Sequence, residues 1–444
     1  MKKIIYKIKA SKVLSNISWI LFGRIIYMAL NFIVGLLSAR YLGPSDYGLI
    51  GYAAAYTTFF ASICTLGINS IIIKEFVDNP KKEGEIIGTS LLLKLISSVL
   101  SLITIMGICF IVDNNEPITR GVVFLYSISI IFQIFETFKY WFQSRLESKY
   151  SEIAVTIAYV VMAIYKIILL ITNKSVNWFA ISNSIEYFVV AILLIYIYKK
   201  KGGQKLTLSK EYAKKIFKKS YHFIISGLMV AVYNSTDKFM LKQMLSESSV
   251  AYYTTAVTLT SLTPILLNAI IMSLTPGILQ EYKENKEKYK QKNIQLYSLV
   301  FYISVIASIL ICLLAPLLIK ILYGIDYSGS VNPLRILTWY TAFSYLGVAR
   351  DPWIVSEDKQ KYLKYIYISC AIINVILNFI LIPNLGASGA AFASLITQFA
   401  TIFVIPLFIR ELRPNVKLMV DGILLKEFDV KKLFKKEDKI YERK

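Results

Sequence analysis

The chain has 444 residues, of which 56% are hydrophobic, and its mean hydropathy is +0.56. This composition is far too apolar for a soluble domain of that size. A formal net charge of +22 would suggest nucleic acid for a soluble protein, but here the basic residues fall in alternate loops between apolar runs, as membrane topology requires. We therefore expect no nucleic-acid partner.

Apolar runs recur along the whole chain at about the twenty residues that a helix needs to cross a bilayer. They predict an all-α polytopic membrane protein with about twelve transmembrane helices in two six-helix bundles. The first run is too long for a signal-peptide core, and we expect it to remain as the first span. The expected spans are 17–39, 47–68, 86–112, 121–142, 153–171, 176–198, 221–241, 250–274, 294–319, 331–355, 363–382 and 387–408.

The first span carries a polar stripe and ends in a polar break. Arg24 lies inside the apolar run, where a charge costs about 2.5 to 3.5 kcal/mol, so it should face protein or water rather than lipid. Tyr27, Asn31 and Ser38 follow at helical spacing on the same face. The break at 42–46 contains Gly and Pro and separates the first two spans. Such a stripe indicates a wet cavity between helices.

The loops differ in charge from one side of the predicted spans to the other. Lysines are dense before the first span, in the loops after even-numbered spans and in the tail, whereas loops after odd-numbered spans are short and poor in lysine. The positive-inside rule then predicts that both termini are cytoplasmic.

The longest polar break, at 199–220, falls near the middle of the chain. It predicts an N-terminal six-helix bundle at 1–198, a cytoplasmic linker at 199–220, a C-terminal six-helix bundle at 221–412 and a basic cytoplasmic tail at 413–444. A weak internal repeat supports a duplication, because transporters are often built from such repeats. It pairs Leu42, Ser45 and Gly48 with Leu245, Ser248 and Ala251. The end of the tail, at 422–444, fits either an amphipathic helix on the inner leaflet or a solvated segment.

Charged residues inside membrane spans are functional hypotheses by default. Lys94 shares a helix face with several serines and either faces a cavity or extends to the headgroups. Lys166 lies on one face with Tyr159, nearer the other end of its span. Glu186 sits well inside its run, and its structural alternative is an ion pair with Lys166 or Lys94.

The seventh predicted span carries Asp237 and Lys238 side by side, with Tyr233 one turn before Asp237. Neighbours in a helix point in different directions, so these two charges cannot fully neutralise each other. At least one of them should face the interface between the two halves.

The sequence contains no motif for ATP binding, zinc proteolysis, serine hydrolysis or thiol redox chemistry. The predicted extracytoplasmic loops are also too short to hold an active site. We expect a protein that is not an enzyme and that has no bound cofactor.

Three features together resemble a known family. They are SARYLGPSDYGLIGYAAAYTTFFASICTLGINSIIIKEF at the first two spans, YNSTDKFMLKQMLSESSVAYYTTAVTLTSL at the seventh and eighth, and the two halves of about six spans each. The chain resembles the polysaccharide transporter family, which contains lipid-linked oligosaccharide (O-antigen or capsule repeat unit) flippases. That family belongs to the multidrug/oligosaccharidyl-lipid/polysaccharide exporter superfamily.

The resemblance implies an undecaprenyl-diphosphate-linked oligosaccharide as substrate, alternating access between two bundles and coupling to an H⁺ or Na⁺ gradient. It also implies a bacterial plasma membrane, contact with membrane lipids and other polysaccharide-assembly membrane proteins, and a monomer. A cationic cavity would suit the diphosphate, and Glu186 or Asp237 would carry the coupling ion. The expected cavity residues are Arg24, Tyr27, Asn31, Lys94, Lys166, Tyr233 and Lys238.

Two alternatives stay open. A drug or organic-cation antiporter of the same superfamily should bind lipophilic cations, which a cavity rich in Lys and Arg should repel. A membrane glycan polymerase or ligase would need a sizeable external loop with acid, base and Arg groups.

Overall fold

The computed structural model describes residues 2–426, except for the side chains at 2–17, 21, 22, 24, 70, 219, 221–226, 229, 230, 233, 234 and 264–266. Two predicted site residues, Arg24 and Tyr233, therefore lie outside the described side chains. So does the part of the tail from 427 onward, where an amphipathic helix was one of two interpretations. The described backbone is helical throughout its ordered elements and contains no β-strand.

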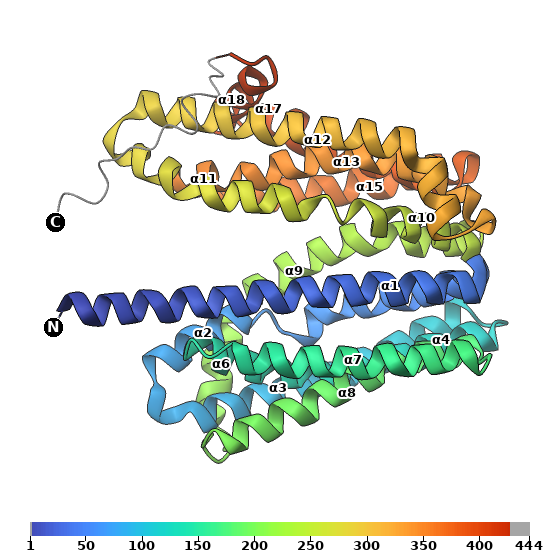
Figure 1. The fold of residues 1–444 in the computed structure, drawn as a ribbon, viewed down its shortest axis with the longest axis horizontal. Coiled ribbons are helices and arrows are strands. Elements are labelled where there is room, and N and C mark those ends of the chain that lie inside the picture. Colours follow the sequence, from blue (N-terminus) through green and yellow to red (C-terminus); the bar gives the residue numbers. More distant parts are fainter. Residues whose placement is uncertain (1, 427–444) are drawn as a thin grey trace. The chain divides into compact units, whose positions relative to one another are not determined.

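The elements follow one another along the chain with short connections (Figure 1). They are α1 (Lys2–Cys64), α2 (Asn69–Asp78), η1 (Pro80–Lys82), α3 (Glu83–Val112), α4 (Pro117–Ser127), α5 (Ser129–Gln133), η2 (Ile134–Glu136), α6 (Thr137–Ser144), α7 (Lys149–Ile171), α8 (Val176–Lys200), α9 (Lys210–Met244), α10 (Glu247–Thr260), α11 (Pro264–Glu284), α12 (Lys286–Leu322), η3 (Ile325–Ser330), α13 (Val331–Ala349), α14 (Asp351–Ser356), η4 (Gln360–Tyr362), α15 (Leu363–Leu385), α16 (Ala387–Phe399), η5 (Ala400–Val404), α17 (Ile405–Leu407) and α18 (Arg413–Ile423).

The polar break predicted at 42–46 interrupts α1. Gly43 has φ +70° and ψ 175°, a non-helical conformation that a residue without a side chain adopts most readily. Pro44 follows it and has no backbone N–H to continue the helical ladder. α1 is therefore two apolar helices joined at Gly43, as the sequence predicts.

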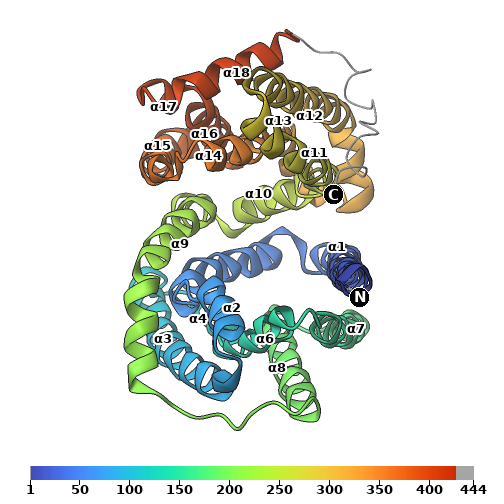
Figure 2. The same cartoon turned by 90° about the vertical axis from the view of Figure 1, so that its left-hand side faces the viewer.

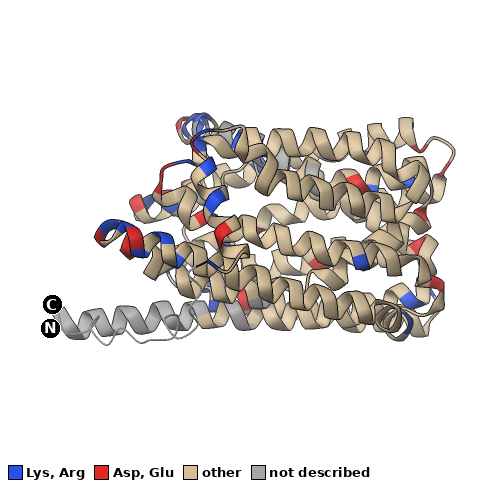
Figure 3. Cartoon of the chain, turned by 90° about the horizontal axis from the view of Figure 1, so that it is seen from above, with Lys and Arg blue, Asp and Glu red and all other residues tan. Residues whose placement is uncertain are grey.

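Eight helices in the described part of the chain are long and apolar enough to cross a membrane. They span Ser18–Cys64, Pro80–Val112, Pro117–Ser144, Lys149–Ile171, Val176–Lys200, Lys286–Leu322, Gln360–Leu385 and Ala387–Leu407. Lys, Arg, Asp and Glu gather toward helix ends, with long uncharged stretches between them (Figure 3). The all-α membrane fold is thus confirmed, while the count of twelve and the cytoplasmic termini stay predictions.

The chain forms two compact units. Unit 1 comprises Met1–Tyr252 and Ile321–Tyr327. Within it, α1 packs against α4, α7 and α9, and α8 packs against α4 and α7 (Figures 1 and 2). Its buried side chains include Trp141, Phe138 and Tyr198 in one cluster and Tyr52 and Tyr56 in another. Residues after the predicted linker therefore pack with the first bundle, through α9 and the start of α10.

The segment between α8 and α9 is held against α3 by backbone contacts. The Thr207 N–H donates to the Gly84 carbonyl at 3.2 Å, and the Ser209 N–H donates to the Thr89 hydroxyl at 3.0 Å. Gly88 allows the close approach, because a Cβ at this position would lie 2.3 Å from the Thr207 carbonyl oxygen. Part of the predicted linker is thus an ordered strap over α3.

Unit 2 comprises Tyr253–Lys320 and Ser328–Lys444. Its core includes Leu296, Tyr297 and Leu346, and α16 packs against both α13 and α15. α18 is fixed to α12, since the Ser298 hydroxyl donates to the Gly422 carbonyl at 2.7 Å. The predicted domain boundaries stay predictions.

Candidate substrate and ion site

Lys94 is buried inside unit 1, at 2% exposure. Its ammonium donates to Asn69 Oδ1 and to Thr137 Oγ1, both at 3.0 Å, and lies 5.6 Å from the centre of the Tyr140 ring. These contacts join α3 to the residues around α2 and α6. They do not agree with the alternative of an amine that extends to the headgroups.

A second group of predicted residues meets where α1, α7 and α8 pack. The rings of Tyr27 and Tyr159 lie 4.0 Å apart in an edge-to-face arrangement. Glu186 interacts electrostatically with Lys166, and with Lys139 from α6. Glu136 forms an ion pair with Lys139. Tyr27, Lys166 and Glu186, which lie far apart in the sequence, are therefore neighbours in space.

Lys166 lies on α7, a helix long and apolar enough to cross a membrane, and is only partly buried. Among the residues that the structure describes, it has no hydrogen-bond or ion-pair partner, and its electrostatic neighbour is Glu186. An ammonium in a span without a direct partner is costly in lipid. It is chemically suited to a phosphate oxygen, to which lysine binds as a mobile point charge.

Asp237 and Lys238 have different surroundings on α9. Asp237 is 4% exposed, whereas Lys238 is partly buried. Lys238 lacks a hydrogen-bond or ion-pair partner within the described part of the chain, apart from the field of Asp237. That these two adjacent charges point in different directions stays a prediction. Asn31, by contrast, is exposed on α1.

The sequence analysis did not predict a cluster of polar side chains at the C-terminal end of α9. We call it the Asp113 cluster; its members are Tyr52, Cys109, Asp113, Glu116, Lys242, Gln243 and Glu247. Asp113 is 3% exposed and accepts hydrogen bonds from Tyr52 at 3.2 Å and from Gln243 at 2.9 Å. Lys242 forms ion pairs with Glu116 at 2.7 Å and with Glu247 at 2.8 Å. The hydrogen bond from Lys242 is the main cause that lowers the pKa of Glu116.

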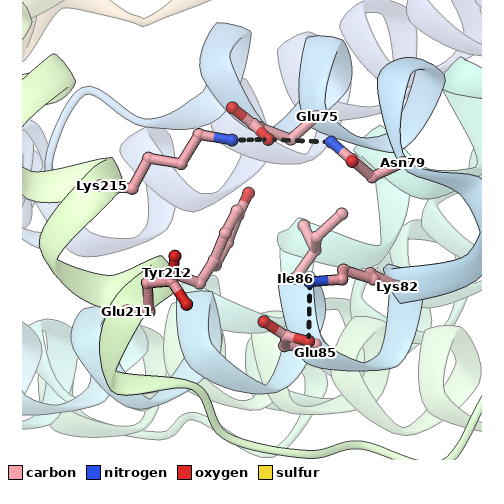
Figure 4. Close-up of a pocket in the computed structure, with 8 residues that line it drawn as sticks. All are labelled: Glu75, Asn79, Lys82, Glu85, Ile86, Glu211, Tyr212 and Lys215. Atoms are coloured by element: carbon pink, nitrogen blue, oxygen red, sulfur yellow. Dashed lines mark hydrogen bonds and ion pairs between the residues drawn. The ribbon is translucent and has the colours of Figure 1, made fainter.

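A small polar pocket of about 90 Å³ lies between α2, the start of α3 and the start of α9 (Figure 4). Lys215 Nζ lies 2.8 Å from Glu75 Oε2, and Asn79 donates to the same oxygen at 3.2 Å. Tyr212 points into the pocket, and burial raises the pKa of its hydroxyl. A space of this size has room for a few waters at most, and the ion pair of Lys215 with Glu75 joins α9 to α2.

Comparison with known proteins identifies the family. The family model described as polysaccharide biosynthesis protein matches residues 13–281, which is more than half of the chain. The chain belongs to the polysaccharide biosynthesis protein family. The MatE family model matches residues 223–380, and no curated protein matches the chain.

Solved structures place this family member in the fold of the multidrug/oligosaccharidyl-lipid/polysaccharide (MOP) superfamily. Lipid II flippase MurJ, in an inward closed conformation, has a TM-score of 0.73 at 12% identity, covering 93% of this chain and 90% of that one. A multidrug resistance MATE family transporter, in an inward-facing conformation, has a TM-score of 0.70 at 16% identity, covering 89% of this chain and 96% of that one. A MOP superfamily transporter from Pyrococcus furiosus has a TM-score of 0.61 at 14% identity, covering 93% of this chain and 94% of that one. At these identities the likeness shows the fold alone.

The predicted resemblance is thus confirmed at the level of the family, and the fold is the one seen in solved structures of the superfamily. The three solved structures named above are two transporters and a flippase. Among the residues that the structure describes, no group of three or more His, Cys, Asp or Glu side chains is placed to hold a metal ion.

Proposed function

We propose that this protein flips undecaprenyl-diphosphate-linked oligosaccharide repeat units from the inner to the outer leaflet of the bacterial plasma membrane. The flipped units would serve surface polysaccharide biosynthesis. The observation that carries this proposal is the pair Lys166 and Lys238, whose amines lack direct partners among the described residues. The family's description as polysaccharide biosynthesis proteins supports the substrate class.

The diphosphate of a lipid-linked oligosaccharide is an anion that these ammonium groups would bind. It carries about two negative charges, and moving an isolated ion into bare hydrocarbon costs tens of kcal/mol. A wet path with ammonium groups replaces part of the lost hydration. Lys166, Lys238 and Arg24 would bind the phosphates. Lys94 would join them after it separates from its present hydrogen-bond partners. Tyr27, Asn31 and Tyr233 would contact the sugars, while the polyprenyl chain stays in lipid.

The energetics favour export. An anion that leaves a negative cytoplasm gains about 2.3 kcal/mol per charge per 100 mV. The return step then needs an entering cation, H⁺ or Na⁺, carried by Glu186 or Asp237. In this proposal the chain has twelve spans with both termini in the cytoplasm, works as a monomer by alternating access, and meets other membrane proteins of polysaccharide assembly. No bound cofactor takes part.

A flipping assay tests the proposal. The protein is reconstituted in vesicles with a fluorescent undecaprenyl-diphosphate-linked sugar, and outward movement is measured by an impermeant quencher. We expect Lys166→Met and Lys238→Met each to slow flipping about tenfold, a loss of about 1.4 kcal/mol of binding to the moving headgroup. Lys290→Met is the matched control, because Lys290 is an exposed residue paired with Glu287. Parental rates in both span variants would contradict the proposal.

A drug or organic-cation antiporter is the second candidate, favoured by the MatE match at 223–380. Glu186 or Asp237 would then bind the cation. Uptake of a fluorescent lipophilic cation by the same vesicles, driven by a pH or Na⁺ gradient, separates the two. We expect no uptake above that of empty vesicles, because Lys166 and Lys238 repel cations.

A further inference from the structure

A cavity of about 570 Å³ lies within unit 2, where the first turns of α12 meet α14 and α18. Its volume falls in the range of about 300–1,000 Å³ that is typical of ligand sites. Four lysines and four carboxylates line it, together with Tyr289, Trp353, Ile294 and Leu418. The proposed transport mechanism uses none of these residues.

Buried contacts hold the walls of the cavity together. The hydroxyls of Tyr289 and Ser356 lie 2.5 Å apart and join α12 to α14. Asn415 donates to the Tyr297 hydroxyl at 2.7 Å and joins α18 to α12. Tyr289 and Trp353 are 3% and 4% exposed, so their rings pack mainly against protein. The cavity is therefore a built feature of unit 2 and not a gap between surface side chains.

The cavity lies where α12 changes from charged to apolar. α12 has 37 residues and is about 55 Å long, which exceeds the hydrocarbon core of about 30 Å. Its first seven residues hold four lysines and one glutamate, and its apolar run begins at Ile294. Lys286 and Ile294 both line the cavity, which therefore extends from the charged stretch to the start of the apolar run. Charged residues gather at helix ends in this way in Figure 3. This is the depth at which lipid headgroups meet acyl chains.

Five of the eight charged residues in the lining are available to a ligand. Lys290 pairs with Glu287 at 2.9 Å, and Asp421 pairs with Lys426 at 2.8 Å. The Glu411 carboxylate is hydrogen-bonded to Tyr362. Among the described residues, no ion pair is formed by the other lining charges, which are Lys286, Lys359, Lys417, Glu357 and Glu411. The site thus offers three ammonium groups and two carboxylates.

This balance of charge selects the chemistry of the ligand. The carboxylates repel a purely anionic ligand, and the lysines repel a purely cationic one. A ligand with a phosphate and a primary amine makes charge-assisted hydrogen bonds to both kinds of side chain. A quaternary amine cannot donate such bonds and binds instead to open aromatic faces. The rings of Trp353 and Tyr289 are covered by protein, and Tyr289 packs against Tyr282 at 5.1 Å.

We propose that this cavity binds the headgroup of a phospholipid that carries a primary amine, phosphatidylethanolamine. Lys359, Lys417 and Lys286 bind the phosphate, and Glu357 and Glu411 bind the ammonium. Leu418 and Ile294 contact the first methylene groups. The bound lipid joins α12 to α14 and α18. The proposal does not rest on the proposed function, because Lys166 and Lys238 belong to unit 1.

Native mass spectrometry of the full chain tests the site. The detergent-solubilised protein is titrated with dioleoyl phosphatidylethanolamine, phosphatidylcholine or phosphatidylglycerol, and the Kd of the first bound lipid is measured. We expect the ethanolamine lipid to bind at least about tenfold more tightly than the other two, because only its headgroup satisfies both signs of charge. Equal affinities for the three lipids overturn the proposal, and so does a preference for either of the others.

Single substitutions locate the binding. Glu411→Gln should weaken binding of the ethanolamine lipid about tenfold without weakening that of phosphatidylglycerol, whereas Lys417→Met should weaken both. The matched controls are Lys283→Met and Glu284→Gln, which change exposed residues at the end of α11 outside the cavity lining. Both controls should keep the native affinity. Native affinity in both cavity variants overturns the site, and so does an equal loss in the controls.

A soluble competitor separates a lipid from a free metabolite. O-phosphoethanolamine has the charged groups of the headgroup but no acyl chains, so it lacks the affinity that buried methylene groups supply. We expect about a hundredfold excess of it to leave the lipid bound, and displacement would overturn the lipid as the occupant. None of these measurements requires transport. Their failure therefore leaves the proposed flippase function standing, and a failed flipping assay leaves the lipid site standing.

Discussion

The ammonium of Lys94 lies 3.0 Å from the hydroxyl oxygen of Thr137, and that hydroxyl donates its own hydrogen to the Ile134 carbonyl at 2.7 Å. The polarity of the contact is thus fixed, since Thr137 can only accept from Lys94. Asn69 Oδ1 supplies the second acceptor. The amine ties α3 to α6 through neutral groups rather than through a carboxylate.

Thr137→Val tests this tie. The substitution preserves the shape of the side chain but leaves one donor of a buried ammonium unsatisfied, at a cost of about 1–3 kcal/mol. We expect a lower midpoint of thermal unfolding for the detergent-solubilised protein. In Lys94→Met the same Thr137→Val change should cost less, because the unsatisfied charge is gone. Equal losses in the two backgrounds would show that the hydrogen bond contributes nothing.

Arg145 and Glu83 give a second stability prediction. Arg145 donates to both oxygens of a nearly buried Glu83, at 2.8 and 2.6 Å, and its guanidinium stacks 4.2 Å from the centre of the Trp141 ring. Lysine can reproduce neither the fork nor the stacking. Arg145→Lys should therefore lower the free energy of unfolding by about 1 kcal/mol. The exposed pair of Lys290 and Glu287 is the control. Lys290→Met should change the free energy of unfolding by less than about 0.5 kcal/mol.

Local sequence signals predicted much of the fold. The apolar lengths located helices such as α7 and α8, and the Gly43–Pro44 dipeptide located the break in α1. These features depend only on residues near one another in the chain. The same periodicity placed Lys94 on a serine-rich face, but it could not identify Asn69 and Thr137 as partners, because those contacts depend on how three elements pack.

The Asp113 cluster is a clearer example of contacts that the sequence alone could not predict. Asp113 and Glu116 stand in a short polar connection that reads as an ordinary loop, and Gln243 lies 130 residues away. No helical spacing relates these positions. Tyr27 and Glu186 were singled out separately by their intramembrane positions, yet only the packing of α1, α7 and α8 brings them together.

The ion pair of Lys242 with Glu116 should respond to acid. Its hydrogen bond lowers the pKa of the Glu116 carboxyl below the usual value of 4.5, so the folded state holds this proton more weakly than the unfolded chain. The stabilisation is then fully present above pH 4.5 and is lost as the pH falls through the lowered pKa. The thermal midpoints of the native chain and of Glu116→Gln should converge below pH 4.5. A constant difference between them across that range would contradict this assignment.

The strap over α3 supplies a prediction with a control in the same helix. At Gly88 an added Cβ would lie 2.3 Å from the Thr207 carbonyl, which is backbone and cannot rotate away, so Gly88→Ala must displace the strap. At Gly107 nothing lies within 4 Å, and Gly107→Ala should be neutral or should gain up to about 1 kcal/mol of helix propensity.

Limited proteolysis measures the difference directly. Trypsin cuts after Lys205, inside the strap, and the cut requires the local backbone to leave α3. Gly88→Ala should be cut several-fold faster than the native protein, because overpacking typically costs 1–3 kcal/mol and here that cost falls on the bound state of the strap. Gly107→Ala should be cut at the native rate. Equal rates in all three proteins would mean that the strap does not depend on the close approach at Gly88.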